Sequence, residues 1–193
     1  ILLRGYATQA SDLVPRSSVT ARGQSPQLAA QATFADAVGI RATDHEGQRK
    51  NPDGTLDGYT NGNVTGYTEG DFINFRFTVS ADEASTGTLQ VRFSGQETQC
   101  LFFEPVFQLG AVQIVSGTTP TVTPVGSPVA SGDEFVQTLS ITFAGSGKAV
   151  VNYTLKLSTQ AGDCTGGSQH SRLNAGTGVS QTGQQNVPVP ANQ

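Results

Sequence analysis

The feature that most constrains the fold is a strict alternation of apolar and polar residues between residues 71 and 79, where the sequence reads DFINFRFTV. Large apolar side chains occupy every second position, at Ile73, Phe75, Phe77 and Val79. Successive side chains of a β-strand point to opposite faces, so a period of two is typical of a strand with one buried face. This segment therefore predicts a central strand of the core.

The same alternation returns in the segments 88–94, 135–143 and 149–157. The link 81–87 has the length of a hairpin loop, and residues 144–147 (AGSG) predict a tight turn that joins the last two segments in a hairpin. Earlier in the chain, the segment 27–37 favours a strand over a short helix. The remaining sequence before residue 34 has no sustained period and is rich in glycine and proline.

Proline and glycine mark the expected edges of the sheets. The apolar segment 101–115 is interrupted by Pro105 and Gly110, which predict bulges, and residues 117–132 carry three prolines that predict an edge strand or a connection. The pattern as a whole predicts an all-β fold, an immunoglobulin-like or jelly-roll antiparallel β-sandwich of about seven strands with an extended N-terminal arm. The expected division is an arm over residues 1–36, a sandwich over 37–163 and a Gly/Ser/Gln/Pro-rich tail, a linker or second arm, over 164–193.

Two cysteines, Cys100 and Cys164, predict a structural disulfide and hence an oxidising compartment, although two unrelated buried thiols are the alternative. The chain begins at Ile1 and contains no Met, from which we expect a mature, secreted form whose leader has been removed. No apolar run is long enough to span a membrane. The formal net charge of −4, with no basic face rich in aromatic residues, argues against nucleic acid as a partner.

The loop between residues 44 and 71 offers Asp53, Asp57 and Asn61 as oxygen ligands for calcium, but turn chemistry explains the same residues and matches the spacing better. Asn63 and Asn152 each begin an Asn-X-Thr sequon and are candidate glycosylation sites. The acidic pair Asp133 and Glu134 is predicted to lie in a turn exposed to solvent. The sequence contains no phosphate-binding loop, dinucleotide fingerprint, nucleophile elbow or zinc motif, so we predict neither a catalytic residue nor a cofactor.

A sandwich body with a long, poorly apolar N-terminal arm resembles, in overall design, strand-exchanging extracellular filament subunits such as pilins and camelysin-like biofilm-matrix fibre proteins. The resemblance covers the arm and the sandwich and transfers no residues. It implies a non-catalytic secreted subunit that polymerises with copies of itself by donating a strand, from residues 1–7 or 28–40, to a neighbour's sheet edge. The alternative is a cell-surface adhesin or carbohydrate-binding module. The small number of aromatic residues, with no Trp and four Tyr, counts against sugar binding.

Overall fold

The computed structural model describes residues 17–22, 29–34, 39–97, 100–164, 169–182 and 186–190. The chain divides into two compact units, Ile1–Val38 and Gly39–Gln193. In the first unit, β1 (Ser17–Arg22) pairs antiparallel with β2 (Ala29–Phe34) along the whole length of both strands. The strand expected within 27–37 is therefore present as β2, and it is paired with a segment whose sequence shows no alternation.

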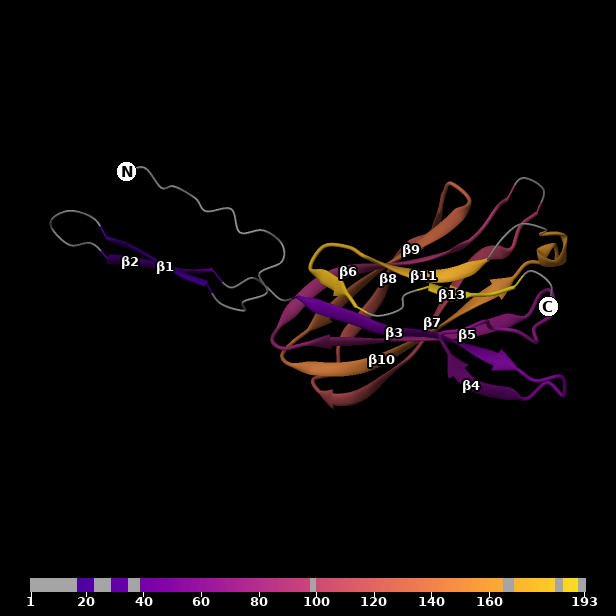
Figure 1. The fold of residues 1–193 in the computed structure, drawn as a ribbon, viewed down its shortest axis with the longest axis horizontal. Coiled ribbons are helices and arrows are strands. Elements are labelled where there is room, and N and C mark those ends of the chain that lie inside the picture. The colour runs from indigo at the N-terminus through magenta and orange to yellow at the C-terminus, as the bar shows by residue number, and fades with distance from the viewer. Residues whose placement is uncertain are drawn as a thin grey trace. The chain divides into compact units, whose positions relative to one another are not determined.

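The second unit is a sandwich of two sheets (Figure 1). The six-stranded sheet has the order β12-β3-β5-β10-β7, with β4 also paired to β3; its strands are β3 (Ile40–Lys50), β4 (Leu56–Thr60), β5 (Phe72–Ala81), β7 (Phe103–Gly117), β10 (Gly147–Leu157) and β12 (Val179–Gln181). The five-stranded sheet has the order β13-β11-β6-β9-β8; its strands are β6 (Ser85–Ser94), β8 (Thr121–Ser131), β9 (Glu134–Phe143), β11 (His170–Ala175) and β13 (Asn186–Pro188). Among the described strands of this unit, β12 pairs with β3 in parallel and the other pairings are antiparallel. The predicted all-β sandwich is confirmed, with more strands than expected.

One apolar core lies between the two sheets and is built from the alternating positions that the sequence indicated. The inward residues of β5 are fully buried, as are the matching residues of β6, β9 and β10: Ile73, Phe75, Phe77, Val79, Leu89, Val91, Phe93, Leu139, Ile141, Val151 and Leu155. Tyr153 of β10 stacks on Phe75 with 5.4 Å between ring centroids and on Phe107 at 5.2 Å. These aromatic contacts join the middle of the six-stranded sheet to β7.

The predicted hairpin of 135–143 with 149–157 is wrong. β9 pairs with β6 and β8, whereas β10 pairs with β5 and β7, so the turn at residues 144–146 carries the chain from one sheet to the other. The link between β5 and β6 also changes sheet. Two strands joined by a short turn show the same alternation whether they lie side by side or face to face, because each buries one face in either case.

The edge and bulge predictions are confirmed. β7 and β8 are the last strands of their sheets on one side. Tyr153 lies opposite Leu109 and Val151 opposite Val112, so β7 holds one extra residue where Gly110 lies. A second irregularity, between Phe103 and Phe107, contains Pro105. The irregularity at Gly110 takes up one residue that the ladder cannot pair, and the irregularity around Pro105 takes up two.

The chain after residue 163 is not only a linker or arm, as the sequence predicted, because its described residues belong to the sandwich. β11 extends the five-stranded sheet beside β6, β13 pairs with β11, and β12 pairs with β3. Leu173, Val187 and Val189 are buried in the core. The prediction failed because these strands are three to six residues long and each buries a single apolar side chain, too few to show a period.

Candidate functional site

The candidate site is the side of the sandwich where β7 and β8 end their sheets. At the other end of the six-stranded sheet, both β12 and β4 pair with β3, and in the five-stranded sheet β13 pairs with β11. β7 has 15 residues and β8 has 11, and within the described residues neither strand has a second pairing partner. Their edges thus present unpaired backbone N–H and C=O groups, which are a template for another strand.

Side chains that point toward the core are incompletely covered along this side. Ile114 lies opposite Ala149, which is fully buried, so Ile114 is on the core-facing side of β7, yet it is 56% exposed. Val112 and Leu109, opposite Val151 and Tyr153, pack against the core but are only half-buried. A core-facing isoleucine that remains in water loses the stabilisation of burial, about 1.5–3 kcal/mol for a complete side chain. One more strand along this side would recover it.

The two open edges differ in their capacity to pair. β8 contains Pro124 and Pro128, and its ladder with β9 is interrupted between Val125 and Val129. Proline has no N–H, and prolines on an edge strand prevent continuous pairing. β7 has no proline after Pro105, so the remaining residues to Gly117 keep every backbone donor. Of the two edges, that of β7 therefore keeps more backbone donors for a further strand, although its bulges interrupt the ladder with β10.

Several interactions hold β7 in place. Cys100, just before the strand, forms the predicted disulfide with Cys164, with 5.3 Å between the two Cα atoms. Lys156 Nζ donates to both carboxylate oxygens of Glu104, at 3.0 and 2.9 Å. In the middle of the strand, Asn152 Nδ2 donates to the carbonyl oxygen of Ala111 at 2.8 Å, beside the bulge. These interactions fix β7 to β10 and to the segment at Cys164, and a pre-ordered edge lowers the entropic cost of adding a strand to it.

A cluster of charged side chains lies on the outer face of the five-stranded sheet. Glu134 accepts hydrogen bonds from Arg92 Nε at 2.7 Å, from Arg172 Nε and Nη2 at 2.7 Å each, and from His170 Nε2 at 2.8 Å. The prediction that this acidic pair is solvated is wrong for Glu134, whose side chain is 7% exposed. Burial by itself raises the pKa of the Glu134 carboxyl, but the hydrogen bonds from Arg172, His170 and Arg92 outweigh it and lower the pKa to about 2.

A second polar group lies inside the core. Tyr153 Oη is 2.6 Å from His45 Nε2 and 2.8 Å from Ser171 Oγ, and all three side chains are buried. The hydroxyl of Tyr153 is thereby satisfied from both sheets, as a buried hydroxyl requires. Burial raises the pKa of Tyr153 far above its usual range. This arrangement joins β3, β10 and β11 and explains His45 as a core residue.

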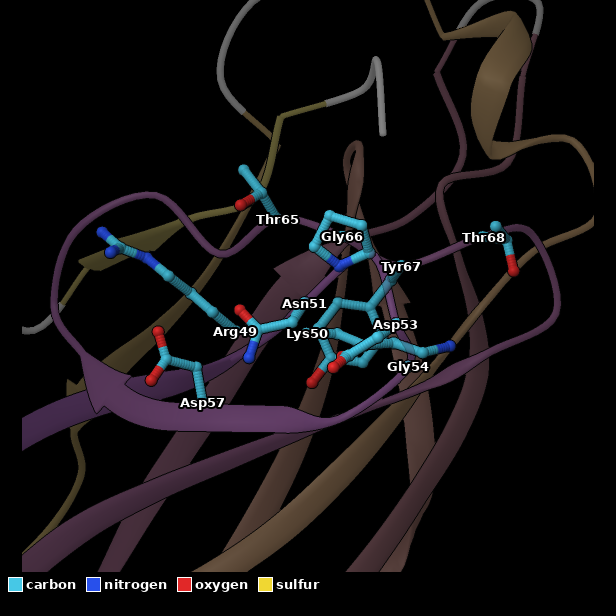
Figure 2. A pocket seen from close by; sticks show the side chains of 11 residues that line it. Arg49, Lys50, Asn51, Asp53, Gly54, Asp57, Thr65, Gly66, Tyr67 and Thr68 are labelled. Carbon is cyan, nitrogen blue, oxygen red and sulfur yellow. The ribbon is translucent and has the colours of Figure 1, made fainter.

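The loop that offered calcium ligands borders an open pocket of about 840 Å³, lined by residues 49–54, 57 and 65–68 (Figure 2). Asp53 Oδ1 accepts from Thr55 N at 2.9 Å and from Thr55 Oγ1 at 2.6 Å, and Asp57 Oδ1 accepts from Gly58 N at 2.8 Å. The hydrogen bonds from Thr55 lower the pKa of Asp53. Both aspartates therefore act as turn residues, and Asn61 does not line this pocket.

Two basic residues, Arg49 and Lys50, line the same pocket, and their positive charges disfavour the binding of a cation there. Within the described residues, the one group of three potential metal ligands is Glu97 with Cys100 and Cys164, and the disulfide occupies both sulfurs. The geometry of the loop thus supports the turn interpretation of the sequence.

The described tyrosines do not form a platform for a sugar ring. Tyr67 and Tyr153 are buried. The ring of Tyr59 is covered by the guanidinium of Arg76, whose carbon lies 4.1 Å from the ring centroid. Sugar platforms usually use an exposed aromatic face, so these three tyrosines do not favour the carbohydrate-binding alternative.

Comparison with solved structures finds distant similarity to this chain. A non-cellulosomal cohesin from the hyperthermophilic archaeon Archaeoglobus fulgidus aligns with 79% of this chain and 91% of its own, at 10% sequence identity and a TM-score of 0.32. No protein-family model and no curated protein matches the chain. Among the described residues, no helix has the length and hydrophobicity to cross a membrane.

Proposed function

We propose that this protein is a non-catalytic structural subunit that polymerises into an extracellular filament or surface layer. Each copy donates a strand from its N-terminal unit to the open side of the next copy, where the strand pairs with β7. The observation that carries the proposal is the exposure of core-facing Ile114 on an edge strand of 15 residues that, within the described part of the chain, pairs with β10 on one side only. A donated strand would pair its backbone with β7 and cover the half-buried apolar residues.

The N-terminal unit suits the role of donor because neither of its two described strands belongs to the sheets of the sandwich. Its described strands, β1 and β2, pair with each other alone. An isolated two-stranded hairpin is marginally stable in water, so β2 can exchange one partner for another at small cost. Of the two expected donor segments, 1–7 lies outside the described residues. The other, 28–40, must end earlier, because Ile40 is a buried residue of β3.

The donor and the acceptor are different surfaces of the same chain. Contacts of this head-to-tail kind repeat without closing unless a rotation brings them into a ring, and they produce open filaments. The disulfide supports an oxidising, extracellular location, because such bonds persist in secreted proteins and are rare in the cytosol.

Removal of residues 1–38 tests the donor. The truncation leaves Gly39 and all of β3 in place, so the sandwich is expected to fold with an unchanged circular dichroism spectrum. Negative-stain electron microscopy should show filaments of the full chain and monodisperse particles of the truncated chain. Filaments formed equally well by the truncated chain would refute donation from the arm.

Two neighbouring substitutions on β7 test the acceptor. Ile114→Lys places a charge on the core-facing side of the edge, whereas Gln113→Lys places the same charge on the outer side, opposite Val150. Both residues are exposed, so the free energy of unfolding of each variant should lie within about 0.5–1 kcal/mol of the native value. We expect Ile114→Lys to abolish filaments and Gln113→Lys to leave them. Equal assembly by the two variants would contradict insertion of a strand beside β7.

A further inference from the structure

We propose that Asn63 is a site of N-glycosylation and that Asn152, which begins the second sequon, is a structural residue that carries no glycan. The two sequons are equivalent in sequence, and the structure separates them. The proposal does not rest on the assembly of the protein into filaments.

Asn63 lies in the loop between β4 and β5, and both it and Thr65 are exposed. The residue between them, Val64, is fully buried, and its N–H donates to the carbonyl oxygen of Pro188 at 3.0 Å. Arg49 Nε donates to the backbone oxygen of Asn63 at 3.0 Å. The backbone of the sequon is therefore anchored from both sides, while within the described residues the Asn63 amide group forms no hydrogen bond.

Asn152 lies in the middle of β10, a strand that is paired on both sides, with β5 and with β7. Its amide nitrogen, the atom that would carry a sugar, donates to the carbonyl oxygen of Ala111 at 2.8 Å. The hydroxyl of Thr154, the third sequon residue, donates to Gln108 Oε1 at 3.3 Å. Both functional groups of this sequon are thus engaged with β7, and a glycan would have to break the contact beside the Gly110 bulge.

The reaction requires a polyprenyl-diphosphate-linked oligosaccharide and its transferase as co-reactants. Asn63 Nδ2 attacks the anomeric carbon of the sugar, so a nitrogen–carbon bond forms and the bond from that carbon to the phosphate oxygen breaks. The nitrogen loses one proton and the lipid diphosphate leaves with the bonding electrons. The threonine hydroxyl two residues later is the element of the sequon that the transferase recognises, and the exposure of Thr65 leaves it available.

The position of Asn63 also leaves the open side of the sandwich free. Its neighbouring strands β4 and β3 are at the end of the six-stranded sheet opposite to β7. A glycan on Asn152 would instead project from the strand next to β7. A sugar on Asn63 is therefore compatible with a partner strand along β7.

Glycopeptide mass spectrometry of the full chain, secreted from a eukaryotic host that N-glycosylates its secretory proteins, tests the assignment. Trypsin separates the two sequons, since cleavage after Lys50 and Arg76 gives peptide 51–76 and cleavage after Lys148 and Lys156 gives peptide 149–156. We expect glycan mass on peptide 51–76 alone, lost completely in Asn63→Gln and in Thr65→Ala and retained in Thr65→Ser. A glycan on peptide 149–156 would overturn the assignment, as would a bare peptide 51–76 when a co-secreted reference glycoprotein is fully modified.

Thermal unfolding of the unglycosylated chain from a bacterial periplasm tests the structural role of Asn152. Asn152→Gln should lower the unfolding midpoint because the longer side chain displaces the amide from Ala111, whereas Asn63→Gln should leave the midpoint unchanged. Equal midpoints for the two variants would overturn the role given to Asn152, whatever the glycan analysis shows.

Discussion

Replacement of Glu134 by Gln removes the carboxylate that three basic side chains share on the outer face of the five-stranded sheet. Arg92, His170 and Arg172 all donate to it at 2.7–2.8 Å. Glutamine is nearly isosteric but uncharged, and its single side-chain oxygen cannot accept all four hydrogen bonds. We expect Glu134→Gln to fold with the native topology and lower stability.

The pKa of Glu134 gives the size of the expected loss of stability. Its fall from the ordinary value of 4.5 to about 2 corresponds to about 3 kcal/mol of preferential stabilisation of the charged form in the folded state. Because Arg172 is 39% exposed, solvent screens part of this interaction, and about 2 kcal/mol is a better expectation. For a chain of 193 residues that loss lowers the unfolding midpoint by about 4–8 °C.

The pH dependence has a definite sign. The folded-state pKa is depressed, so the stabilisation is complete above the unfolded-state value near 4.5 and is lost as the pH falls toward about 2. The free energies of unfolding of the native protein and of Glu134→Gln, measured in urea with the disulfide intact, should therefore differ by about 2 kcal/mol at pH 7. Near pH 2 the difference should be close to zero.

Glu46→Gln is the matched control. Glu46 pairs with Arg76 at 2.7 Å, but the Glu46 side chain is 27% exposed against 7% for Glu134. Removal of the Glu46 charge should therefore lower the free energy of unfolding by less than about 1 kcal/mol. A difference for Glu134→Gln that stays constant from pH 7 to pH 2 would refute the electrostatic reasoning, as would equal losses in the two variants.

Three further changes have expected outcomes in the same unfolding assay. Replacement of Cys100 and Cys164 by Ser opens a loop with a sequence separation of 64 residues and should cost about 4 kcal/mol, a loss that reduction of the native protein should reproduce. Tyr153→Phe removes the hydroxyl shared by two buried side chains and should cost about 1–3 kcal/mol; no loss would contradict its place in the core network. Gly66→Ala should lower the free energy of unfolding clearly more than Gly54→Ala. Both glycines have positive φ, which costs a non-glycine residue about 1–2 kcal/mol, but the new Cβ at residue 66 would overlap the backbone oxygen of Lys50, whereas at residue 54 it meets nothing within 4 Å.

Local sequence patterns were sufficient for the features that local physics controls. A period of two identified the strands and their buried faces, from Ile73 on β5 to Leu155 on β10, because alternation follows from the geometry of a single strand. Pro105 and Gly110 marked bulges and the prolines of β8 marked an edge, because each residue type limits its own backbone. Two cysteines were enough to predict the disulfide.

Tertiary structure decided which strands are neighbours and therefore where the candidate site lies. Alternation does not say whether a turn joins strands of one sheet or of two, so the open side formed by β7 and β8 was not visible in the sequence. The short strands β11, β12 and β13 exist only through pairing with segments far along the chain. The buried charge of Glu134 had the same cause: its partners are 36, 38 and 42 residues away, and long-range pairing of strands brings them together.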